Sequence, residues 1–304
     1  MNLLFGLAII IAAQFMVVPT YAQTVTATIV PVQIDGGIES LFVPPLSPRP
    51  FMLPDGIVSA SSGSIRYAWL THPTTRYAHG VIGDAIEAGG LAVETENHAF
   101  LTLTLGADAV FEDRIARIVR LDGEDGILVV KSYLERGAAL AFVRAESNAI
   151  RIVAESAPIG TSHRWLNPIG IADFDNDGRD EIAAILTPHI GGQLTLYRQD
   201  NGALREAYRI GGFSNHSIGS RELGWSAIVD ANGDGTPDIV VPDTERHALR
   251  IVTFAGGRFA ELARVSLPAA LASSLGVATR KLGGKPEVFL ELADRQTYVL
   301  HFAN

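Results

Sequence analysis

The sequence contains no cysteine, which excludes disulfide bonds, metal sites built on thiolates and a cysteine nucleophile. It also lacks an excess of positive charge, because 24 Lys and Arg residues stand against 33 Asp and Glu residues, for a formal net charge of −9. Nucleic acid is therefore not an expected partner, since its phosphates require a basic surface. Hydrophobic residues make up 47% of the 304 residues, which is enough for a sizeable core and argues against global disorder.

Long apolar runs are absent except near the start of the sequence. Residues 3–18 are almost entirely apolar, and Thr20-Tyr21-Ala22 follows them as a small-x-small cleavage pattern. We interpret residues 1–22 as a signal peptide and predict an extracytoplasmic protein, periplasmic or secreted, with no membrane span after cleavage. The alternative is an uncleaved membrane anchor, but the run is short for a span and contains Gln14.

A proline-rich stretch follows the apolar run. Residues 23–60 include "VPPLSPRPFMLP", a composition that favours extended chain over hydrogen-bonded structure. This segment is either an extended linker or an arm that packs on the folded domain, and we place that domain at residues 61–304.

Helical periodicity is almost absent from residue 61 onward. Short β-rich runs alternate with turn clusters, and only "LPAALASSLG" at 267–276 reads as a short helix. Units of four short strands begin near residues 80, 116, 169, 226 and 276, which predicts an all-β fold, a β-propeller of five four-stranded blades. The fifth unit has three strands, so we expect the N-terminal strand at 64–72 to close the last blade. A β-sandwich is the alternative, although it does not explain the repeated loop.

Two units contain a matched acidic loop. The first is "DFDNDGRDE" at 173–181 and the second is "DANGDGTPD" at 230–238. Acidic side chains at alternate loop positions, a glycine at the turn and a closing acid together suit Ca²⁺, which takes six to eight oxygen ligands. The candidate metal ligands, with two backbone carbonyls among them, are Asp173, Asp175, Asp177, Arg179, Glu181, Asp230, Asn232, Asp234, Thr236 and Asp238.

This spacing resembles the FG-GAP/VCBS repeat family of extracellular and periplasmic β-propellers. The resemblance implies calcium in the loop between the two inner strands of a blade. It is strong in two units and degraded in three, because Arg120 stands at the first ligand position of the second unit, while Asp84 and Glu87 alone remain in the first. We therefore expect about two calcium ions, with metal-free Asx turns as the alternative.

The loops of the opposite face are rich in histidine, arginine and aromatic residues. Such loops at the mouth of a propeller predict a ligand site, and arginine and aromatic side chains suit carbohydrate or an anionic group. The candidate ligand-binding residues are Arg76, His79, Arg164, Trp165, Asn167, His189, His216 and Arg246. A metal bound by His79, His189 and His216 is a further possibility.

No nucleophile elbow, zinc-protease motif or phosphate-binding glycine loop is present in the sequence. We therefore predict no catalytic residue and a monomeric, non-catalytic binding or interaction module, whose ligand is a carbohydrate or another extracytoplasmic protein. The alternative is a hydrolase or lyase that acts on carbohydrate or an anionic substrate through the His/Arg-rich face. A purely structural envelope component is the third possibility.

Overall fold

The computed structural model describes residues 24–42, 44–279 and 285–303. The predicted signal peptide lies outside the described residues. Within them every regular element is a β-strand, except for two short 3₁₀ helices, η1 (Ile38–Leu41) and η2 (Ala255–Gly257). The prediction of an all-β fold is confirmed, and none of the described helices is long and apolar enough to cross a membrane.

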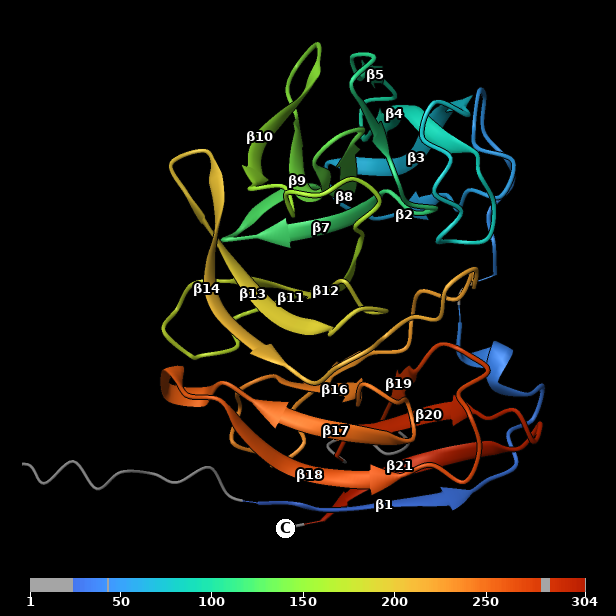
Figure 1. Ribbon diagram of the computed structural model, residues 1–304, viewed down its shortest axis with the longest axis vertical. Helices are drawn as coiled ribbons and strands as arrows, with labels where there is room; N and C mark the ends of the chain where they lie inside the picture. The colour runs from blue at the N-terminus through green and yellow to red at the C-terminus, as the bar shows by residue number, and fades with distance from the viewer. Residues whose placement is uncertain (1–23, 43, 280–284, 304) are drawn as a thin grey trace, which may run out of the picture.

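Antiparallel pairing arranges the strands in groups that follow the order of the chain (Figure 1). The first group contains β2 (Ser59–Ala60), β3 (Ile65–Thr74), β4 (Glu87–Thr95) and β5 (Phe100–Thr104); the second contains β7 (Arg117–Leu121), β8 (Glu124–Tyr133), β9 (Gly137–Ala145) and β10 (Ile150–Ser156). The third contains β11 (Leu166–Ala172), β12 (Glu181–Leu186), β13 (Gln193–Asp200) and β14 (Ala203–Gly211). The fourth contains β15 (Ala227–Val229), β16 (Asp238–Pro242), β17 (Ala248–Thr253) and β18 (Ala260–Ser266). The fifth contains β19 (Gly276–Ala278), β20 (Glu287–Glu291), β21 (Thr297–Ala303) and β1 (Thr26–Pro31).

Two additional pairings connect the first three groups into one curled sheet. Strand β6 (Ala109–Phe111) pairs with both β4 and β8, and β10 pairs in parallel with β14 through Glu155 and Ala203. Repeated four-stranded groups joined in chain order around a curled sheet are consistent with a β-propeller.

The strand that completes the last group is not the predicted one. Strand β1 pairs with β21 along its whole length, from Thr26 opposite Ala303 to Pro31 opposite Tyr298, so the first and last described strands lie side by side (Figure 1). The segment 64–72 cannot pair there, because β3 already pairs with β2 on one edge and with β4 on the other. Its residues Ala68 to Leu70 are buried, as expected for an inner position rather than an outer edge.

The predicted starts of the inner strands are confirmed for four groups and wrong for the first. Strands β7, β11, β15 and β19 begin within three residues of the predicted positions. In the first group the inner strand is β2, only two residues long, and residues 80–86 lie in the connection between β3 and β4. A strand of two residues carries no alternation, so the sequence pattern could not reveal it.

The helix predicted at 267–276 does not form. Its backbone instead bonds to neighbouring chain: the N–H of Ala272 donates to the carbonyl of Glu291, and the N–H of Leu275 donates to that of Gly224. Leu271 and Leu275 are both buried in the core between the fourth and fifth groups. The helical spacing of these leucines therefore reflects burial of an irregular connection against two sheets.

The proline-rich segment packs on the domain where the structure describes it. Ile38 is buried against β20 and β21, and Leu53 is buried beside β3 and β4. The indole N–H of Trp69 donates to the carbonyl of Pro50 at 3.0 Å. This part of the segment is therefore an arm packed on the domain and not an extended linker.

Strand β1 is expected to be required for stability. A chain that begins at Gln33 would leave the edge of β21 unpaired and uncover the apolar surface that Val25 and Ile29 contribute to. An exposed edge also favours aggregation. We expect a lower melting temperature and concentration-dependent aggregation relative to a chain that begins at Gln23, measured by thermal unfolding and light scattering. Equal melting of the two chains would contradict a closing role for β1.

Candidate functional site

The two acidic loops occupy equivalent places and have the same backbone conformation. One joins β11 to β12, and the other joins β15 to β16. Each has two residues with positive φ at matching positions, Asn176 at 59° and Gly178 at 90° in one, Gly233 at 79° and Gly235 at 87° in the other. The predicted repeat is therefore a repeat of three-dimensional structure as well as of sequence.

The first aspartate of each loop binds the backbone of its own turn. The Asp173 carboxylate accepts the N–H groups of Asp177 at 3.0 Å and Gly178 at 2.8 Å. In the second loop Asp230 accepts the N–H groups of Asp234 at 3.1 Å and Gly235 at 2.9 Å. These bonds hold the turn and direct the following side chains to a common side of the loop.

The closing acids are the first residues of β12 and β16, and both are fully buried. Glu181 accepts the N–H of Phe174 at 2.9 Å, and Asp238 accepts the N–H of Ala231 at 3.0 Å. Burial raises the pKa of Glu181, and burial raises the pKa of Asp238 to about 6. Ionised carboxylates at these positions therefore need a compensating cation.

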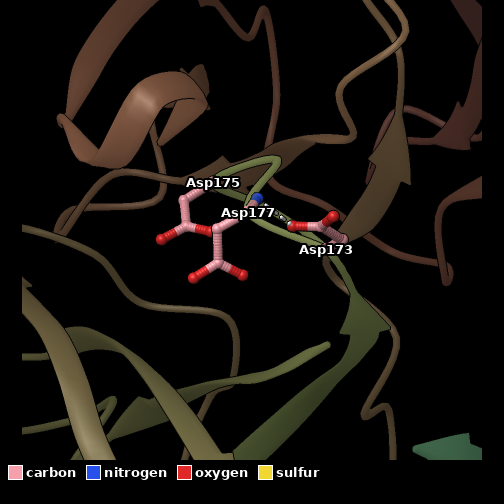
Figure 2. Close-up of side chains that lie close together, drawn as sticks. All are labelled: Asp173, Asp175 and Asp177. Atoms are coloured by element: carbon pink, nitrogen blue, oxygen red, sulfur yellow. Dashed lines mark hydrogen bonds between the residues drawn. The ribbon is translucent and has the colours of Figure 1, made fainter. Parts of the chain in front are cut away.

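The loop at 173–181 gathers three carboxylates in a small volume. Asp173, Asp175 and Asp177 each place one oxygen within 4.8 Å of the others, and Figure 2 shows their side chains around the same turn. Among the described residues this is the one group of three or more acidic or histidine side chains that meets so closely. The predicted clustering is thus present, and oxygen donors of this kind suit Ca²⁺.

A guanidinium group already lies within that cluster. Arg198 on β13 forms ion pairs with Asp175, with Asp177 at 2.9 Å and with Glu181 at 2.5 Å. The hydroxyl of Tyr208 on β14 also donates to Asp175, at 2.8 Å. Neither residue has a signal in the loop sequence, so sequence reasoning about the loop alone missed both.

In the loop at 230–238 no arginine or lysine among the described residues lies between the acidic side chains, so a cation could bind there without displacing one. The Asn232 amide donates to Asp234 at 2.8 Å, and the N–H of Asp234 returns to the Asn232 oxygen at 2.9 Å. The second oxygen of Asp238, Oδ1, is buried without a hydrogen-bond partner, as is Oδ1 of Asp175 in the first loop. A buried carboxylate oxygen left without a donor is the condition that a bound cation would relieve.

The equivalent connection in the second group is too short for such a loop. Only Asp122 and Gly123 separate β7 from β8, and both have positive φ, as a tight hairpin turn requires. Asp122 instead exchanges hydrogen bonds with Asp180, each carboxylate accepting the other's backbone N–H, at 2.7 and 2.9 Å. Asp84 lies on the connection between β3 and β4 and pairs with Arg221 at 3.2 Å.

On the opposite face, loops of several groups enclose a pocket of about 210 Å³. Four of the predicted ligand-binding residues line it, namely His79, Arg164, Trp165 and His189, and His163 lines it as well. His216 lies behind them, fully buried, with its Nδ1 atom 2.8 Å from Nε2 of His189.

Three of the predicted ligand-binding residues are bound elsewhere. Arg76 donates to the carbonyls of Ala109 at 3.1 Å and Gly106 at 3.2 Å. The amide of Asn167 is buried and donates to the carbonyl of Leu223 at 2.9 Å, while Arg246 donates to the Ser214 hydroxyl at 3.0 Å. These side chains hold connections between strand groups together.

The hydrogen bonds around His189 show which of its ring nitrogens carries the hydrogen, namely Nε2. His216 Nε2 lies 3.0 Å from the carbonyl of Ser220, which can only accept, so this nitrogen carries the hydrogen. His216 Nδ1 then accepts from His189 Nε2, which leaves a lone pair on His189 Nδ1. Burial lowers the pKa of His189 to about 4, so the ring is neutral at neutral pH.

The same reasoning applies to His163 and His79. The Ser162 hydroxyl donates to the carbonyl of Leu134 at 2.6 Å, so it accepts from His163 Nδ1 at 2.9 Å. His79 Nδ1 lies 2.5 Å from the buried carboxylate of Glu112. Each of these rings therefore has its Nδ1 held by the protein and its Nε2 left as the second hydrogen-bonding atom.

Two carboxyl groups near the pocket are buried, Glu112, which carries no sequence signal, and Glu87, which the sequence offered only as a remnant of the acidic loop pattern. Glu112 is bound by His79 and by the Ser132 hydroxyl, and burial raises its pKa against the lowering effect of the hydrogen bond from His79. Glu87 is fully buried, and neither of its carboxyl oxygens has a hydrogen-bond partner. Burial and then the nearby charge of Glu112 raise the pKa of Glu87 to about 9.

A larger cavity of about 790 Å³ lies between the packed arm and the inner ends of several strand groups. It is lined by Phe42 and Pro44 of the arm and by Arg114, Arg117 and Arg221. These arginines form ion pairs with Asp55, Asp113 and Asp84 respectively. The arginines that border the cavity are therefore already paired with carboxylates.

Comparison with known families supports the resemblance seen in the sequence. Residues 173–241 match the model of the FG-GAP-like repeat, a range that includes both acidic loops. This match confirms the similarity to the FG-GAP/VCBS repeat family over these residues. No curated protein matches the chain.

The buried Glu87 is expected to make stability depend on pH. Its pKa in the folded protein, about 9, lies above the ordinary value of 4.5, so its contribution to stability is full below about pH 4.5 and is lost as pH rises toward 9. The slope reaches at most about 1.4 kcal/mol per pH unit. Glu87→Gln cannot ionise and should remove this loss.

Denaturant unfolding at pH 5, 7 and 9 measures the effect. Glu96→Gln, at an exposed position, is the matched control and should behave like the wild type. If Glu87→Gln loses stability with pH as steeply as the wild type does, Glu87 is not the group responsible.

Proposed function

We propose that the protein is an extracytoplasmic, calcium-stabilised β-propeller of five blades that binds a ligand without catalysis. The strand groups correspond to the blades, and β1 completes the fifth. The observation that carries the proposal is the pair of acidic loops with one backbone conformation and a fully buried closing acid. The FG-GAP-like repeat match over 173–241 supports it.

Calcium in this proposal stabilises the fold. Carboxylates a few ångströms apart repel one another by about 4 kcal/mol for each pair at 4 Å near a protein surface. A cation that binds the folded loop and not the unfolded chain removes this repulsion and stabilises the fold by mass action. Loops of this type suit the calcium concentrations found outside the cytoplasm.

Asp234→Ala is expected to abolish the rise in melting temperature that calcium produces in the wild type, because it removes a carboxylate from the more open loop. Thermal unfolding with excess CaCl₂ and with a chelator measures the rise. Asp84→Ala is the control and should retain the full rise, since Asp84 lies in another connection. An unchanged rise in Asp234→Ala would contradict calcium binding at 230–238.

The histidine pocket is the proposed ligand site. Its walls are the Trp165 and His189 rings, stacked with an interplanar angle of 6°, and the His163 ring, which stacks on Tyr77 at 4.9 Å between centroids. The Nδ1 lone pair of neutral His189 accepts a hydrogen bond, Nε2 of His163 offers a second hydrogen-bonding atom, and aromatic faces pack on apolar ring surfaces. A saccharide unit offers both hydroxyl donors and an apolar ring face, so carbohydrate is the proposed ligand class.

His163→Ala and His189→Ala should each weaken carbohydrate binding at least tenfold, with melting temperatures close to that of the wild type. The probe is a panel of neutral and acidic oligosaccharides, with binding measured by calorimetry. His98→Ala is the matched control, because His98 lies on the turn between β4 and β5 and its side chain is 82% exposed. Saccharide binding that survives in both pocket variants would place the ligand elsewhere.

A second candidate function is supported by one contact. His79 Nδ1 is held by the buried Glu112 carboxylate, the arrangement that orients a general base. A hydrolase or lyase acting through His79 would release product from the saccharide panel over time. Binding at equilibrium without product supports the binding module.

No basic surface is needed for these roles, and the proposed partners are a saccharide or another extracytoplasmic protein rather than nucleic acid. The protein is proposed to act as a monomer, with no membrane span after removal of the signal peptide.

A further inference from the structure

We propose that Arg198 is the resident cation of the loop at 173–181, and that the chain therefore binds one calcium ion, at 230–238, in place of the two expected from its sequence. This inference rests on the proposed calcium-binding function and assigns different chemistry to the two loops. The two loops differ in the residue that faces them from the neighbouring strand, which is Arg198 on β13 and Thr253 on β17.

Arg198 contacts three of the five carboxylates of its loop. Its guanidinium binds three carboxylates, those of Asp175, Asp177 and Glu181, and so lies where a shared cation would lie. Two of these acids are buried, and the Arg198 side chain is itself only 22% exposed. A guanidinium presents several donors in a fixed plane and remains charged at all ordinary pH values.

The second loop offers a direct comparison at the same position. On β13 Tyr197 pairs with Ile182, and on β17 Val252 pairs with Ile239. Both isoleucines directly follow the closing acid of their loop, so the next residues along β13 and β17, Arg198 and Thr253, are structurally equivalent.

Thr253 is short and uncharged, and its hydroxyl lies beside Asp238. The residue equivalent to Tyr208 is Ala263, because Leu196 pairs with Tyr208 and Ile251 pairs with Ala263. The second loop thus lacks both side chains that enter the first. Among the described residues, its carboxylates at 230, 234 and 238 form no ion pair with lysine or arginine.

Calcium in the first loop would have to displace Arg198. The guanidinium would then either leave its three carboxylate partners or remain beside a divalent cation and be repelled by it. Breaking a partly buried ion-pair network is strongly unfavourable, because it leaves charge without a partner. The arginine therefore excludes calcium from this loop and stabilises it at any calcium concentration.

Exchanging the two residues tests the inference. The four full-length chains are the wild type, Arg198→Thr, Thr253→Arg and the double exchange, each titrated with CaCl₂ by calorimetry after chelator treatment. The inference predicts one ion for the wild type, two for Arg198→Thr, none for Thr253→Arg, and one for the double exchange. Arg198→Thr should melt lower than the wild type in chelator and recover most of that loss in calcium.

A second pair of variants covers the case in which an exchanged chain fails to fold. Asp177→Asn and Asp234→Asn change the same position in the two loops of the wild type. Asp177→Asn should still bind one ion, whereas Asp234→Asn should bind none. Two ions in the wild type, with one lost in Asp177→Asn, would overturn the arginine assignment and leave calcium binding intact.

Failure of the proposed function gives a different pattern. If the wild type binds no ion but Arg198→Thr binds one, the arginine assignment holds and calcium at 230–238 is wrong. If neither chain binds calcium, both statements are overturned.

Discussion

The carboxylates crowded at the starts of β12 and β16 require nearby positive charge, because the sheet buries the first residue of each strand. Glu181 and Asp238 open the two strands and are fully buried, so their charge cannot be left to solvent. The remaining acids of each loop add to the repulsion. In one loop Arg198 supplies a positive charge from the neighbouring strand. In the other no lysine or arginine among the described residues pairs with the carboxylates, so we propose that an external cation balances them.

The functional side chains of the opposite face are mainly histidines, each held by a partner in the protein. Each pocket histidine has one ring nitrogen held by a fixed partner, namely Glu112 for His79, Ser162 for His163 and His216 for His189. Fixed partners set the tautomers and reduce the entropy lost when a ligand binds. In the proposed function the acidic loops stabilise the strand groups, and the connections on the other face form the ligand site.

Features of the molecule that depend on local sequence pattern could be predicted from the sequence, and features that depend on strand pairing across the chain could not. The acidic spacing at 173–181 and 230–238 predicted the matched loops, because the ligand positions and the glycine lie within nine consecutive residues. Strand β1 could not be predicted as the partner of β21, since nothing local specifies a partner at the other end of the chain. Arg198 was missed for the same reason, because its role follows from the register of β12 and β13.

We propose that two loops with the same acidic spacing and the same backbone conformation are balanced by different cations, an arginine in one and calcium in the other. A crystal structure of the wild-type protein grown with calcium, with anomalous scattering used to locate the ion, tests it most directly. We expect one calcium peak among Asp230, Asn232, Asp234 and Asp238, and Arg198 in contact with Asp175, Asp177 and Glu181. A calcium peak within 173–181, with Arg198 turned away, would contradict it.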